Sequence, residues 1–126
     1  MPKKTWLILA WSWTIIIAVL CLVSFKEFPT VRVANADKYV HGVMHFLFVV
    51  LWYQYYRRSR GLPKLWLLGK SLLYSVLYGC LIEVAQECCC TTRMADLRDV
   101  LANFIGAFAG VMLLWALDYS REINQE

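Results

Sequence analysis

Charged residues are scarce in this chain. Only 17% of its 126 residues are charged and 60% are hydrophobic, whereas a soluble domain carries nearer to a quarter charged residues. The apolar residues also gather in long blocks instead of spreading at the spacing of an amphipathic helix. Both features argue against a water-soluble domain and favour a membrane protein of about one domain's length.

Signatures of several chemistries are also missing. The sequence contains no glycine-rich phosphate loop and no dinucleotide fingerprint, and it has no Ser-His-Asp order typical of a catalytic triad. No basic stripe alternates with aromatic residues, so the net charge of +4 predicts no nucleic-acid partner. The cysteine run at 88–90 suits neither a CxxC zinc site nor easy mutual pairing. We interpret it as incidental, with a disulfide to another chain or a lipid attachment as alternatives, and we expect no cofactor.

Four apolar blocks are long enough to span a bilayer, which takes about 20 residues. They cover residues 6–25, 39–56, 65–85 and 100–117. The first block follows two lysines, as in a secretory signal peptide, but it exceeds the apolar core of about 7–15 residues typical of such peptides. Residues 25–28 also make a poor small-residue cleavage site. We therefore predict an all-α, four-transmembrane-helix bundle in a single domain over residues 1–126.

Basic residues predict the orientation of this bundle. The segment 57–64 carries four basic residues and no acid, and lysines and arginines concentrate on the cytoplasmic side of membrane proteins. The N-terminal lysines and Arg121 fall on the same side. We therefore predict N-in/C-in topology in a cytoplasmic membrane. The aromatic residues at this side are interpreted as interfacial anchors: Trp6, Trp11, Trp13, Tyr53, Tyr55, Tyr56 and Trp66.

Polar residues mark the opposite ends of the last three blocks. Up-and-down threading brings these ends to one side of the bilayer, and residues three or four apart share a helix face. The stripes are Asp37, His41 and His45, then Ser75, Gly79, Glu83 and Gln86, then Asp96, Asp99, Asn103, Gly106 and Gly110. Because lipid cannot satisfy polar groups, we expect the stripes to face one another. The glycines and alanines of the fourth block should allow close helix packing.

Glu83 is the most demanding of these residues. It lies within an apolar run, near the end of a helix, where the helix dipole disfavours an anion. It therefore needs a partner, and Arg93, Lys38 and His41 are the candidates. Asp96 and Asp99 have an alternative role in capping the fourth helix, while Gln86 and Asn103 could bond helices together. The cluster is then either a closed salt-bridge network or a site for an anionic head group.

The motifs of this cluster resemble the VanZ-like family. They are Asp37-Lys38-x-x-His41, Gly79-x-x-x-Glu83-x-x-Gln86 and Arg93-x-x-Asp96-x-x-Asp99-x-x-x-Asn103-x-x-Gly106, in order over about residues 37–110. The resemblance implies a small integral membrane protein of the bacterial envelope, in the inner membrane. Its founding member is associated with reduced susceptibility to teicoplanin-type glycopeptide antibiotics. The chain departs from the family pattern at Gly42 and His45.

Together these features predict an outward-facing polar pocket. We expect it to bind or modify an anionic envelope component, such as a lipid-linked or surface glycan intermediate, with membrane lipids as its other partners. Arg93, Lys38 and His41 would engage the anion. The candidate ligand-binding residues are Asp37, Lys38, His41, Glu83, Gln86, Arg93, Asp96, Asp99 and Asn103. The candidates for a catalytic group are Glu83, Asp99 and His41.

Two alternatives come from other classes of protein. In a metal-dependent membrane hydrolase, Asp37, His41, His45 and Glu83 would bind a divalent ion. In a non-catalytic accessory protein, the same cluster would only fix the bundle. The sequence predicts neither a particular substrate nor an oligomeric state.

Overall fold

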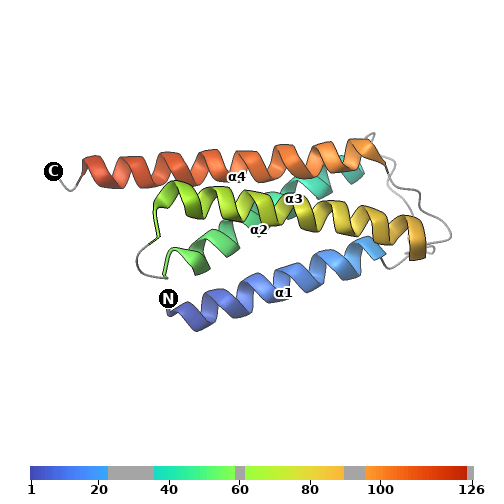
Figure 1. Cartoon of the computed structure of the whole chain (residues 1–126), viewed down its shortest axis with the longest axis horizontal. Helices are drawn as coiled ribbons and strands as arrows, with labels where there is room; N and C mark the ends of the chain where they lie inside the picture. The colour runs from blue at the N-terminus through green and yellow to red at the C-terminus, as the bar shows by residue number, and fades with distance from the viewer. Residues whose placement is uncertain (23–35, 59–61, 90–95, 125–126) are drawn as a thin grey trace.

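The computed structural model describes residues 1–22, 36–58, 62–89 and 96–124, and over these ranges it is a bundle of four helices (Figure 1). The helices are α1 (Lys3–Leu22), α2 (Ala36–Tyr56), α3 (Lys64–Cys89) and α4 (Leu97–Ile123). Each predicted apolar block corresponds to one helix, which confirms the all-α prediction.

Consecutive helices run in opposite directions (Figure 1). The end of α1, the start of α2, the end of α3 and the start of α4 therefore lie together at one end of the bundle, here called the motif end. The start of α1, the end of α2, the start of α3 and the end of α4 lie at the other end, here called the terminal end. The expected up-and-down threading is confirmed, while the side of the membrane on which each end lies stays a prediction.

Three of the helices are long and apolar enough to cross a membrane, over Lys3–Leu22, Lys64–Cys88 and Leu97–Arg121. Helix α2 has a comparable length of 21 residues but is not one of these three, and it carries Asp37, Lys38 and two histidines near its start and middle. It contacts all three other helices, which bury both histidines, while Lys38 is partly buried and Asp37 is exposed. Many large apolar residues on the other helices are exposed, as a lipid-facing surface requires. The chain is therefore a membrane protein with several spans.

Glycine sets the distance between α2 and α4. A Cβ atom at Gly106 would lie 1.9 Å from the carbonyl oxygen of Gly42, and one at Gly110 would lie 3.1 Å from the carbonyl oxygen of Phe46. No side chain fits at Gly106 without moving one of the two backbones. The close packing expected from the small residues of α4 is thus present, and it holds the starts of α2 and α4 together.

Helix α1 is attached by polar contacts as well as by packing. The indole nitrogen of Trp13 donates to the carbonyl oxygen of Met44 at 2.9 Å, and the Tyr78 hydroxyl donates to the carbonyl oxygen of Thr14 at 2.6 Å. Ile17 and Cys21 pack against residues of α2 and α3. These contacts cross three helices, so α1 is an integral part of the bundle.

Candidate functional site

The motif end gathers polar side chains from three helices. We call this group the motif-end cluster, and it consists of Asp37, Lys38, His41, Glu83, Asp96, Asp99 and Asn103. Lys38 lies in the first turn of α2 and reaches across to the start of α4. The Lys38 Nζ atom is 3.3 Å from Oδ2 of Asp96 and 3.3 Å from Oδ1 of Asp99. Lys38 therefore pairs with the acids of α4 and not with Glu83.

His41 joins the three polar stripes. Its side chain is only 3% exposed. Its Nδ1 atom is 3.1 Å from Oδ1 of Asn103 and 4.0 Å from Oε1 of Glu83, and its Nε2 atom is 3.9 Å from Oδ1 of Asp37. A proton on Nδ1 would be donated to Asn103. Because one side chain contacts groups on α2, α3 and α4, the expected convergence of the stripes is confirmed.

Glu83 is buried among these groups with only part of its hydrogen-bonding capacity used. Its Oε2 atom accepts the backbone N–H of Asp96 at 3.2 Å. Its Oε1 atom and the Nδ2 atom of Asn103 are buried and have no hydrogen-bond partner among the residues that the structure describes. Gly79 makes room for Asn103, since a Cβ at Gly79 would lie 3.0 Å from that Nδ2. The site thus offers an acceptor and a donor beside one imidazole.

The two acids at the start of α4 have different roles. The side chain of Asp96 accepts the backbone N–H of Arg98 at 2.9 Å, which is the geometry of a helix N-cap. This hydrogen bond, together with the Lys38 ammonium, lowers the pKa of Asp96 below its ordinary value. Asp99 is instead buried and turned towards Lys38. The capping role expected for both acids therefore fits Asp96.

Two predicted residues lie deeper in the bundle or face another helix. His45 is one turn beyond His41, and its Nδ1 atom is 2.8 Å from the Ser75 hydroxyl. The Gln86 amide donates to the carbonyl oxygen of Cys21 at 2.9 Å, so this contact ties α3 to α1. Arg93 and Cys90 fall outside the described residues.

The geometry also changes the set of candidate metal ligands. Ligand atoms of Asp37, His41 and Asp99 lie within 4.8 Å of one another. The predicted set of Asp37, His41, His45 and Glu83 is not the one assembled here, because His45 faces Ser75. Metal binding by these residues stays a prediction.

A second polar cluster, which sequence reasoning missed, lies at the terminal end. Asp118 of α4 is 6% exposed. It accepts a hydrogen bond from the Tyr53 hydroxyl, and its Oδ1 atom is 2.6 Å from Nη1 of Arg57 and 3.6 Å from Nη1 of Arg121. Tyr53 is 1% exposed, so its interpretation as an interfacial anchor is wrong. The available signal was a carboxylate near a helix C-terminus, the same signal that singled out Glu83.

Comparison with known proteins identifies the family. A family model described as VanZ/LLP1 matches residues 4–118, which is nearly the whole chain. Searches of curated proteins and of solved structures found no match.

Proposed function

The chain belongs to the VanZ/LLP1 family, and from that premise we propose that the motif-end cluster is the functional site of this membrane protein. We propose that it binds or modifies an anionic component of the bacterial cell envelope, such as a lipid-linked glycan intermediate. An effect on susceptibility to teicoplanin-type antibiotics, as for the founding member, is part of the same proposal and would follow from a change in that component.

The incomplete hydrogen bonding around His41 carries this proposal. Oε1 of Glu83 and Nδ2 of Asn103 are buried and have no hydrogen-bond partner in the described ranges. A buried polar group left unpaired costs about 1–3 kcal/mol, so a cluster that served only to hold helices together would be expected to pair both. A ligand hydroxyl has both the donor and the acceptor that these atoms require, and a phosphate oxygen would accept a hydrogen bond from Nδ2 of Asn103.

The balance of charge indicates what else the site needs. Four carboxylates, those of Asp37, Glu83, Asp96 and Asp99, stand against Lys38 and His41. Lys38 already contacts two of the acids, so it cannot attract an anion alone. The sequence supplies Arg93 three residues before Asp96, and its planar guanidinium matches phosphate in a forked geometry. We propose that Arg93 binds the anion and that Lys38 and His41 assist it.

A metal-dependent hydrolase is the second candidate, favoured by the mutual approach of Asp37, His41 and Asp99. A divalent ion at these residues would offset the excess of acids. It could also bridge the site to a phosphate and activate a water molecule for its hydrolysis. In that case Asp99 and His41 would be ligands, and Arg93 would contribute less to binding.

A binding measurement in lipid nanodiscs tests the proposal. The probe is a fluorescent polyprenyl phosphate, and the variants are Arg93→Ala, Asp99→Asn and Arg98→Ala. Arg98 is the matched control, since it is an exposed arginine at the same end of the bundle. We expect Arg93→Ala to weaken binding about tenfold, as the loss of a charge-assisted hydrogen bond would, with Arg98→Ala within twofold of the unmodified protein.

A chelator distinguishes the two candidates. If EDTA abolishes binding and Asp99→Asn mimics its effect while Arg93→Ala does not, the metal site is favoured. If the Arg93→Ala and Asp99→Asn proteins both bind like the unmodified protein and EDTA has no effect, the cluster is structural and the proposal is wrong.

A further inference from the structure

Lys70 occupies an unusual position on α3. It lies six residues after the start of the helix, about 9 Å along its axis, and inside the candidate span Lys64–Cys88. An ammonium group at such a depth is costly unless it finds a partner or reaches the membrane interface. No carboxylate pairs with Lys70 among the described residues, where its ammonium group contacts aromatic rings. Its charge therefore has no protein counter-charge in this part of the chain.

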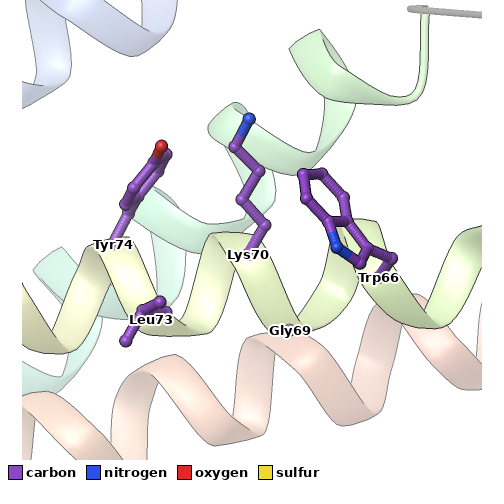
Figure 2. A pocket seen from close by; sticks show the side chains of 5 residues that line it. All are labelled: Trp66, Gly69, Lys70, Leu73 and Tyr74. Carbon is purple, nitrogen blue, oxygen red and sulfur yellow. The ribbon is translucent and has the colours of Figure 1, made fainter. Parts of the chain in front are cut away.

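Three rings hold the ammonium in place. The Lys70 Nζ atom is 4.3 Å from the ring centroid of Tyr56, 5.0 Å from that of Trp66 and 5.5 Å from that of Tyr74. Figure 2 shows Trp66, Lys70 and Tyr74 rising from one side of α3, with Lys70 between the two rings. Cation–π contacts of this kind stabilise an ammonium, but the rings carry no net charge. They fix the position of the positive charge and leave it available to an anion.

An apolar groove runs beside this lysine (Figure 2). It has a volume of about 410 Å³ and is lined by Trp66, Gly69, Lys70, Leu73 and Tyr74. Trp66, Leu73 and Tyr74 are 51%, 55% and 42% exposed, so the groove opens on the outer surface of the bundle. Nothing lies within 4 Å of a Cβ built on Gly69, which leaves space along the helix at that point. In a membrane span such a surface faces lipid.

We propose that the Lys70 groove binds an anionic phospholipid. The lipid phosphate would pair with the Lys70 ammonium, and an acyl chain would lie in the groove beside Leu73. Charge complementarity favours an anionic over a zwitterionic lipid, and the apolar walls favour a lipid over a water-soluble phosphate. The site lies towards the terminal end and shares no residue with the motif-end cluster, so it stands independently of the function proposed there.

Native mass spectrometry of the purified full-length protein tests this site. The affinities for phosphatidylglycerol and phosphatidylcholine are compared in the unmodified protein and in the Lys70→Gln, Lys70→Arg and Lys4→Gln variants. Lys4 is an exposed lysine at the same end of the bundle, so it controls for a general loss of charge. We expect an approximately fivefold preference for phosphatidylglycerol. This is the gain in affinity that about one lysine provides near an anionic lipid. Lys70→Gln should abolish that preference, while Lys70→Arg and Lys4→Gln should retain it.

A second variant separates the groove from the charge. Gly69→Leu keeps Lys70, and its Cβ would meet no atom within 4 Å, so the protein should fold. We expect its affinity for phosphatidylglycerol to fall at least threefold. Unchanged phosphatidylglycerol binding in both Lys70→Gln and Gly69→Leu would overturn the proposal. Full displacement of the lipid by millimolar glycerol phosphate would also overturn it, because the site would then take a head group alone.

Discussion

Glu83 and Asp118 are buried carboxylates at opposite ends of the bundle, and their surroundings differ. Both oxygens of Asp118 have partners, in Tyr53, Arg57 and Arg121. Glu83 accepts one backbone N–H and keeps its Oε1 atom without a hydrogen bond in the described structure. The complete network around Asp118 is typical of a structural cluster, because every buried polar atom is paired. The incomplete network around Glu83 favours a site that accepts a further group.

At this scale we expect Tyr53→Phe to destabilise the fold without affecting the motif-end cluster. The substitution keeps the buried ring and removes the hydroxyl that donates to Asp118, which should lower the free energy of unfolding by about 1–2 kcal/mol. Tyr119→Phe is the matched control, since Tyr119 is 53% exposed on the same helix as Asp118. Unfolding by denaturant in detergent micelles measures the free energy of unfolding of both variants. Equal stability of the two variants would contradict a structural role for the Tyr53 hydroxyl.

At the scale of the helices, α2 explains why the bundle can carry so many polar residues. It contacts α1, α3 and α4 and holds Lys38, His41 and His45 where neighbouring helices supply partners. Its approach to α4 depends on Gly106, whose missing side chain lets the two backbones meet. The contact between these helices therefore positions His41 beside Asn103, and the site depends on it.

We expect Gly106→Ala and Gly42→Ala to have very different effects, although both replace a glycine at the same helix crossing. A Cβ at Gly106 would lie 1.9 Å from the Gly42 carbonyl oxygen, so the helices must separate, at a cost of about 1–3 kcal/mol or more. A Cβ at Gly42 would lie 3.5 Å from the Ala102 carbonyl oxygen, an ordinary contact. Thermal unfolding compares the stabilities of the two variants. A Gly106→Ala protein as stable as Gly42→Ala would contradict the close approach.

At the scale of the whole molecule, the elements and their threading could be predicted from the sequence, while several side-chain partners could not. Apolar blocks of about 20 residues fix helix number, and alternation of direction fixes which ends meet. Partners depend on the rotation and depth of each helix, which periodicity alone does not give. Lys38 was a candidate partner for Glu83 but lies against Asp96 and Asp99, and His45, four residues deeper than His41, meets Ser75.

Orientation is a property of the whole chain, and we expect both termini in the cytoplasm. The segment 57–64 holds four basic residues and no acid, and such segments stay on the cytoplasmic side. A fluorescent reporter fused after Glu126 should be fluorescent, whereas a periplasmic phosphatase fused there should be inactive. The reverse pattern would place the motif-end cluster in the cytoplasm and contradict a site that faces the outer envelope.

The central claim is that the motif-end cluster serves a ligand and does more than hold the helices together. Its most direct test is the envelope lipid profile of cells that lack the gene and carry either Arg93→Ala or the control Arg98→Ala. We expect the Arg93→Ala protein to reach near-normal levels in the membrane and fail to restore the profile, while Arg98→Ala restores it. Arg93→Lys should also fail, less completely, because lysine keeps the charge and loses the forked geometry. Full restoration by Arg93→Ala at normal levels would contradict the account and leave only the helix bundle.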